Sequence, residues 1–148
     1  MRQITLEFRG DRLGNEKQVD ELNQRVKLKV QPSPIHGVGV FALRDISEGE
    51  RLYANILPAF YDLPYSHFTK LFPHVRELLL ERFPRIVEGE LFAYPDSLLQ
   101  SFMNHAENCN YDNQTDKAIV DIPKGTELFE DYRNIPGWET VFPWLVVK

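Results

Sequence analysis

The chain has 148 residues, of which 43% are hydrophobic and 26% charged, so its composition is that of one globular domain. Its formal net charge of −5 excludes broad electrostatic binding to nucleic acid and suits a basic peptide or protein partner, although the same charge also serves solubility. No apolar stretch approaches the 18 residues of a membrane span, and the single cysteine, Cys109, excludes an internal disulfide framework and a cysteine-based zinc cluster.

The first 25 residues are the most polar part of the chain, and we interpret residues 1–25 as an N-terminal appendage. Ile4, Leu6 and Phe8 alternate with polar residues, which predicts a short edge strand. The rest of this segment is either a loose arm or a short helix near residues 15–25.

Three strands are predicted next. Apolar residues alternate with lysines from Val26 to Val30, which is typical of a half-buried strand, and Pro32 ends it. A second strand follows a glycine turn within residues 37–43. A third strand is predicted over residues 51–57, where Pro58 ends it.

The middle of the chain predicts two short helices. Ser66 is expected to cap a helix over residues 67–72. Pro73 is expected to begin the second helix, since proline is tolerated at a first helical position, and Pro84 to stop it. The apolar residues of the second helix recur at helical spacing: Val75, Leu78, Leu79 and Phe83.

The second half of the chain returns to short strands. These are predicted at residues 91–94, 117–122 and 127–132, and an apolar run covers residues 98–103. Several short strands with one small helical insert predict a β-rich α+β domain rather than a parallel α/β sheet.

Three segments carry polar groups suited to chemistry, although each also has a purely structural explanation. The glycines of residues 36–39 permit close backbone approach, or form a tight turn. Residues 102–105 offer neutral donors and acceptors after an apolar run, or form a capped helix end. Residues 125–132 end in a tyrosine that supplies a hydroxyl, or that only packs. The four histidines have no close metal-ligand spacing, so we expect no metal site.

Taken together, in this order and spacing, the three segments resemble the motifs of the SET domain, the fold of S-adenosylmethionine-dependent protein lysine methyltransferases. The matching segments read HGVGVFALRDISEGE, SFMNHAENCN and DIPKGTELFEDY. The resemblance covers about residues 26–133 and implies short strands in small sheets, a helical insert and a knot-like C-terminal arrangement. Residues 134–148 would form an apolar flank that closes the site.

The resemblance implies methyl transfer from S-adenosylmethionine to the side-chain amine of a protein lysine, leaving S-adenosylhomocysteine. Tyr132 would be the catalytic residue, with its hydroxyl beside the methyl group and the lysine nitrogen. The residues implied to bind the cofactor are His36, Gly37, Val38, Gly39, Phe102, Asn104, His105 and Tyr132.

Four residues are assigned to the substrate channel: Tyr94, Glu130, Trp138 and Trp144. Glu130 stands where many family members carry the Phe or Tyr that tunes the number of methyl groups added. A carboxylate in an apolar lysine channel would either ionise at a cost or pair with the incoming ammonium. Ser101 replaces the family arginine, Ala106 and Glu107 replace a Ser-Cys pair, and Cys109 replaces a proline.

The alternative function is a SET-fold module that binds a partner or the cofactor with little or no turnover. The expected partner of the enzyme is a protein or peptide that bears a lysine, with no nucleic acid and no membrane. The apolar C-terminal flank would pack on the core, complete the channel or make a homodimer contact. We expect a cytoplasmic location, because the chain has one thiol and no apolar signal segment, or a nuclear or host-cell nuclear one if the source is eukaryotic, viral or a pathogen.

Overall fold

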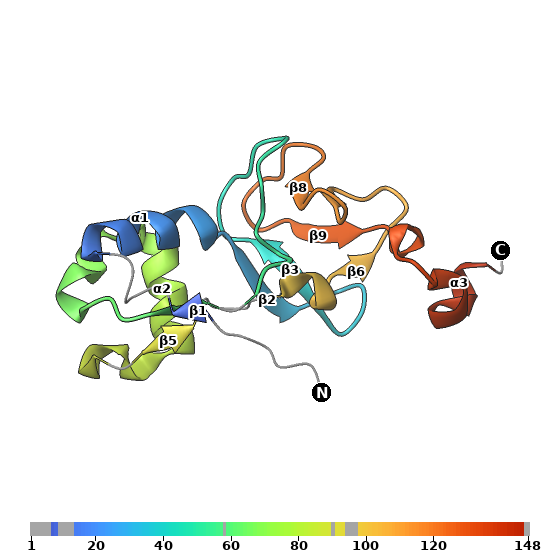
Figure 1. Cartoon of the computed structure of the whole chain (residues 1–148). Coiled ribbons are helices and arrows are strands. Elements are labelled where there is room, and N and C mark those ends of the chain that lie inside the picture. The colour runs from blue at the N-terminus through green and yellow to red at the C-terminus, as the bar shows by residue number, and fades with distance from the viewer. Residues whose placement is uncertain (1–6, 9–13, 58, 90, 94–97, 147–148) are drawn as a thin grey trace, which may run out of the picture.

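The computed structural model describes residues 7–8, 14–57, 59–89, 91–93 and 98–146, and every structural statement below concerns these residues. Its strands are β1 (Glu7–Phe8), β2 (Leu28–Pro32), β3 (Val38–Ala42), β4 (Ala59–Tyr61), β5 (Phe92–Ala93), β6 (Asn104–His105), β7 (Tyr111–Asp112), β8 (Lys117–Ala118) and β9 (Glu127–Glu130). Its α-helices are α1 (Asn15–Arg25), α2 (Pro73–Arg82) and α3 (Trp138–Val141). Short 3₁₀ helices are η1 (Tyr65–Lys70), η2 (Pro84–Glu88), η3 (Leu99–Phe102), η4 (Tyr132–Asn134) and η5 (Pro143–Leu145). Figure 1 shows α1 and α2 at one end of the molecule, the largest sheet in the middle and α3 at the other end.

The largest sheet has four strands in the order β2-β3-β9-β6. The β2–β3 and β3–β9 pairs are antiparallel, with Val40 opposite Leu128, whereas β6 runs parallel to β9, with Asn104 opposite Phe129. Gly37 adopts a φ of +49° in the turn between β2 and β3, a region that favours glycine. Because β9 lies between β3 and β6, the sheet brings together three segments that are far apart in the sequence.

The helical end has its own hydrophobic cluster. Val19 and Leu22 of α1 are buried with Phe68 of η1 and with Val75 and Leu79 of α2. Of the two alternatives left open for the chain near residues 15–25, a loose arm or a short helix, the structure shows the helix, and the helix predicted to begin at Pro73 is confirmed as α2. Although it was predicted as part of a polar appendage, α1 contributes two core residues; the division of the chain at residue 25 stays a prediction.

The predicted strand over residues 51–57 is wrong. Arg51 makes only an isolated bridge to Lys117, and Tyr53 adopts a φ of +55°, which interrupts an extended strand. Asp116 accepts hydrogen bonds from the backbone N–H groups of the two residues that flank Tyr53. Its carbonyl accepts from Leu52 N at 2.9 Å, and its Oδ1 accepts from Ala54 N at 3.0 Å. The extended backbone instead appears later, in β4.

Other elements differ in length or kind. Residues 67–72 were expected as a helix capped by Ser66, but η1 begins at Tyr65 and has no side-chain cap. The strands expected at 117–122 and 127–132 shorten to β8 and β9, and Tyr132 begins η4. The edge strand near Phe8 is confirmed as β1, which pairs with β4, while Ile4 and Leu6 lie outside the described residues.

The described residues contain neither a membrane-spanning helix nor a group of side chains suited to a metal ion. None of their helices is long and apolar enough to cross a membrane. Nor do any three of their His, Cys, Asp or Glu side chains group so as to hold a metal ion. With short strands in small sheets and few helices, the chain has the predicted α+β architecture.

Candidate active site

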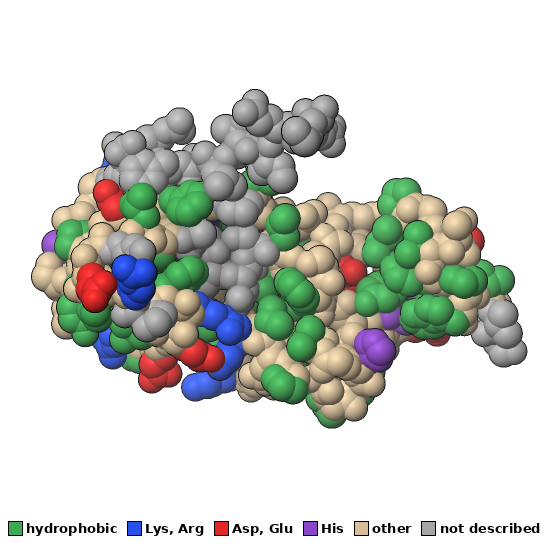
Figure 2. Space-filling view, turned by 90° about the horizontal axis from the view of Figure 1, so that it is seen from below, with side chains coloured by type: hydrophobic (Ala, Val, Ile, Leu, Met, Phe, Trp, Pro, Cys, Tyr) green, Lys and Arg blue, Asp and Glu red, His purple; other side chains and the backbone are tan. Residues whose placement is uncertain are grey.

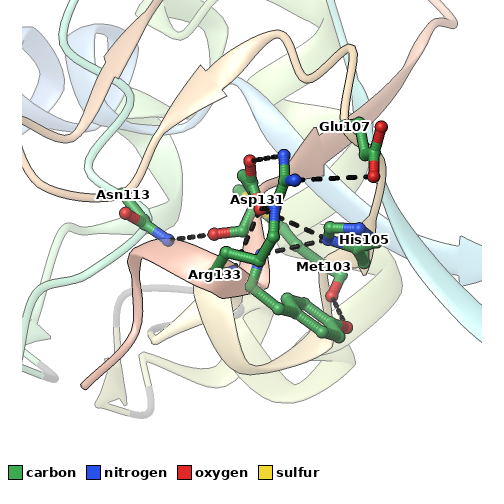
Figure 3. Close-up of polar contacts among 7 residues, drawn as sticks. Met103, His105, Glu107, Asn113, Asp131 and Arg133 are labelled. Carbon is green, nitrogen blue, oxygen red and sulfur yellow. Dashed lines mark hydrogen bonds and ion pairs between the residues drawn. The ribbon is translucent and has the colours of Figure 1, made fainter. Parts of the chain in front are cut away.

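The turn after β9 determines where Tyr132 lies. The Asp131 carboxylate caps η4, because its Oδ1 accepts from the backbone N–H of Arg133 at 3.0 Å. The Arg133 guanidinium returns to the same carboxylate, with Nη2 2.7 Å from Oδ2, and holds the pKa of Asp131 below its usual range. Figure 3 shows this pair beside His105 and Met103. Charge-assisted hydrogen bonds between Asp131 and Arg133 therefore fix the turn directly after β9.

Tyr132 is held from three sides. Its hydroxyl donates to the carbonyl of Met103 at 2.6 Å, and its backbone N–H donates to His105 Nδ1 at 3.0 Å. Its ring stacks on Phe142 with centroids 4.4 Å apart. Since Nδ1 of His105 accepts, a neutral His105 carries its proton on Nε2. Burial, with a smaller contribution from the Glu130 charge, raises the pKa of Tyr132, so its hydroxyl stays protonated near neutral pH.

Two cavities meet at Tyr132 and Phe142. The first, which we call the aromatic cavity, has a volume of about 580 Å³. It is lined by Ile35, His36, Asn104, His105, Tyr132, Phe142 and Trp144. Five residues predicted for the site therefore surround one space. Figure 2 shows hydrophobic side chains gathered at the end of the molecule that carries α3.

Asn104 connects β6 to the loop before β3. Its Nδ2 lies 3.1 Å from both the His36 and Val38 carbonyls, 2.9 Å from Glu127 Oε2 and 3.2 Å from Ser33 Oγ. One amide nitrogen has only two hydrogens, so these four acceptors share them. Asn104 is buried, and its side chain fixes one wall of the aromatic cavity rather than standing free within it.

Glu127 is a site residue that the sequence analysis missed. Its carboxylate accepts from Ser33 Oγ at 2.8 and 2.9 Å and from Asn104, and it lies directly over Gly39. A Cβ on Gly39 would lie 2.3 Å from Glu127 Oε2, so any larger residue would push this carboxylate away from its hydrogen bonds. The requirement for glycine in the first motif is thus explained by a residue of the third motif.

The second cavity, which we call the Glu130 cavity, has a volume of about 430 Å³. Its walls are Asn55, Leu98, Gln100, Ser101, Met103, Glu130, Tyr132, Ile135 and Phe142. Glu130 is 3% exposed, and burial raises its pKa to about 7 although the amides of Gln100 and Asn113 oppose the shift. Two spaces of different polarity therefore share one tyrosine.

A family model for the SET domain matches residues 37–133, which is more than half of the chain. The chain belongs to the SET-domain family. All three segments that carry the resemblance lie in or next to this match, and in this SET domain they meet where β3, β9 and β6 are neighbours.

Solved SET-domain structures also resemble the chain. A candidate histone methyltransferase of Plasmodium falciparum is 20% identical, with 72% of this chain and 92% of that chain covered and a TM-score of 0.36. The Chaetomium thermophilum Polycomb Repressive Complex 2, in an autoinhibited conformation bound to S-adenosylmethionine, is 22% identical. There 82% of this chain and only 17% of that chain are covered, with a TM-score of 0.38. No curated protein matches the sequence. The family membership therefore rests on the match over residues 37–133.

Two of the remaining predicted residues of this SET domain, Phe102 and Trp138, line neither of the two cavities. Phe102 is 45% exposed at the end of η3, and Trp138 begins α3 without lining either space. Trp144, predicted for the substrate channel, lines the aromatic cavity instead. Tyr94 lies outside the described residues. Gly37 and Gly39 act through the backbone of the loop that Asn104 holds.

Phe142 is the second residue that the sequence analysis missed. It lines both cavities and stacks on Tyr132, yet it lies ten residues further along the chain, in the apolar C-terminal flank. The only signal in the sequence was the general apolar character of that flank. Its contact with Tyr132 depends on how the chain folds back after η4, which the sequence pattern does not indicate.

Proposed function

We propose that this protein transfers a methyl group from S-adenosylmethionine to the side-chain amine of a lysine in a protein substrate. SET-domain proteins are mostly protein-lysine methyltransferases, and the single observation that carries the proposal is the meeting of two cavities at Tyr132 and Phe142. Two reactants that approach one tyrosine from separate spaces are brought together in a fixed orientation, which is a large part of catalysis of a two-substrate reaction.

The residues of the aromatic cavity fit S-adenosylmethionine. A volume of about 580 Å³ is within the range of small-molecule sites, and the walls are aromatic with a few neutral polar groups. Trp144 and His105 offer ring faces to an adenine, and the loop at His36 offers backbone groups to an amino-acid end. When bound, the cofactor supplies an electrophilic methyl group on a sulfonium.

The chain itself supplies positioning and exclusion of water. The Tyr132 hydroxyl stays protonated and donates a hydrogen bond to the Met103 carbonyl. The lone pairs of its oxygen are therefore available to accept a hydrogen bond from an N–H of the lysine. Phe142, Ile135 and Leu98 form the apolar part of the Glu130 cavity. Burial of an ammonium group against such walls lowers its pKa, and a neutral amine is the nucleophile.

The second candidate is a binding module with little turnover. The observation in its favour is the buried carboxyl of Glu130, in a position where family members with an apolar channel carry an aromatic ring. If Glu130 only held the lysine as an ion pair, it would keep the nitrogen protonated and suppress attack. The two candidates make the same prediction for cofactor binding and opposite predictions for methyl transfer.

A labelling experiment tests the proposal. The protein is incubated with methyl-labelled S-adenosylmethionine and a protein extract, and labelled lysines are identified by mass spectrometry. Label on a lysine side chain supports the enzyme. Cofactor binding without label on any lysine supports the binding module.

A binding measurement tests the cofactor site. Asn104→Ala removes the amide that holds the loop at His36 and Val38, so we expect S-adenosylhomocysteine to bind about 10-fold more weakly or worse by calorimetry. Asn134→Ala, at an exposed position of η4, is the matched control and should bind like the wild type. Equal affinities for S-adenosylhomocysteine in the wild type and both variants would show that Asn104 does not contribute to cofactor binding.

A further inference from the structure

One carboxyl oxygen of Glu130, a residue that lines the Glu130 cavity, has no hydrogen-bond partner. Glu130 is the last residue of β9, is 3% exposed and lines the Glu130 cavity. Its Oε2 is buried and has no hydrogen-bond partner. A buried acceptor without a partner costs free energy, and a ligand in the cavity that donates a hydrogen bond to it would remove that cost.

The groups around Glu130 are already engaged or uncharged. The amides of Gln100 and Asn113 lower the pKa of its carboxyl against the effect of burial. The hydroxyl of Tyr111 donates to Asp116 at 2.7 Å, and that of Tyr132 donates to Met103. His105, opposite Glu130 in the β6–β9 register, uses Nδ1 to accept from the backbone of Tyr132. Among the described residues, no Lys or Arg compensates the Glu130 charge.

We propose that Glu130 binds the side-chain nitrogen of the incoming lysine and takes its proton, an inference that rests on the proposed lysine methylation. One N–H bond of the ammonium breaks and an O–H bond forms at Oε2. The nitrogen keeps the electron pair and becomes neutral, and the carboxylate becomes a carboxylic acid. Glu130 would then act as the proton acceptor that converts the lysine to the neutral nucleophile. It would not inhibit the reaction by holding the lysine as an ammonium in an ion pair.

Burial makes this transfer feasible. A lysine amine has an ordinary pKa of about 10.4 and a glutamate about 4.3, so the proton would favour nitrogen by about 10⁶-fold in water. Burial raises the pKa of Glu130 to about 7, which reduces that preference to about 10³-fold. Loss of water around the ammonium in the same cavity lowers its own pKa, by about 3–5 units for a fully buried amine, which is enough to cancel the remaining preference.

Infrared difference spectroscopy with n-butylammonium, a probe of the lysine side chain, tests the proposal. At about pH 8.5 the free Glu130 is ionised, because this pH lies above its pKa. We expect the probe to produce a carboxylic-acid band in the wild type and in Glu107→Gln, which changes an exposed carboxylate, but not in Glu130→Gln. Butyltrimethylammonium has no proton to give and should leave the carboxylate band unchanged, and this comparison needs no variant.

Affinity and turnover provide the second readout. Glu130→Gln cannot accept the proton, so we expect it to bind n-butylammonium at least 10-fold more weakly and to methylate lysine at least 10-fold more slowly near pH 7. A bound probe with no acid band, equal affinity in Glu130→Gln, or equal or faster methylation by that variant would overturn the proposal. The probe requires no cofactor, so an acid band in a protein that labels no lysine would uphold the amine site and refute methyl transfer.

Discussion

Replacing Tyr132 by Phe removes one hydroxyl and leaves the aromatic ring. The ring keeps its stacking on Phe142, at 4.4 Å, and the only bond lost is the one to the carbonyl of Met103. One neutral hydrogen bond is worth about 1 kcal/mol, so the melting temperature should fall by roughly 2–4 °C in a chain of this size. In the proposed reaction the hydroxyl positions the amine in the transition state, so its loss should lower kcat by roughly 10²-fold.

The assay compares binding with turnover. Calorimetry with S-adenosylhomocysteine should give an affinity within a few-fold of the wild type, because the variant keeps the aromatic wall of the cavity. Methyl transfer to the lysine identified by labelling should be slow at saturating substrate, which marks an interaction made in the transition state. Tyr65→Phe, which removes an exposed hydroxyl in η1, is the matched control and should be fully active. A Tyr132→Phe variant with turnover within about 2-fold of the wild type would show that this hydroxyl plays no part in the reaction.

Two further predictions concern the carboxylates of β9. Gly39→Ala puts a Cβ 2.3 Å from Glu127 Oε2 and should cost about 2–3 kcal/mol of unfolding free energy in a urea titration, because the carboxylate must leave its hydrogen bonds. Gly14→Ala has open space around it and should cost less, about 0.5–1 kcal/mol, because Gly14 is the N-cap of α1 and alanine is a poorer N-cap residue. The same Gly39 substitution on a Glu127→Ala background should cost little, and an equal cost there would refute the steric explanation. The folded state binds a proton at Glu130 more tightly than the unfolded state does, since its pKa is about 7 instead of 4.5. The free energy of unfolding should therefore fall by about 3 kcal/mol through this group as pH rises from about 4.5 to about 7, and a Glu130→Gln variant that follows the wild-type pH dependence would contradict this.

Local pattern was sufficient for some elements and failed for others. The alternation that begins at Val26 and the proline before α2 predicted β2 and α2 because those elements depend on neighbouring residues. The strand predicted at 51–57 failed because its backbone donors bind Asp116, more than sixty residues away. No sequence pattern within residues 51–57 indicates that their backbone will bind Asp116.

The same limit applies to the candidate site. Tyr132, Asn104 and His105 were identified from the resemblance to a family, and the structure places them around one cavity. Glu127 was overlooked because in the sequence it is one acidic residue among several, and only its contact with Gly39 gives it a role. The separation of the two cavities by Tyr132 and Phe142 depends on packing after η4, which no spacing rule predicted.

The position of β9 in the sheet also has a consequence for how the chain is made. Val40 of β3 pairs with Leu128, and the loop before β3 is held by Asn104 and Glu127. During synthesis from the N-terminus, β2 and β3 can form a hairpin early, but the loop before β3 lacks Asn104 until residue 104 has been made and lacks Glu127 until residue 127 has been made. Pairing between strands that are distant in the sequence delays folding, because the entropy cost of closing the long intervening segment comes before the stabilising contacts form. A nascent chain stalled before residue 127 would therefore lack both β9, which pairs with β3, and the carboxylate that holds the loop before β3.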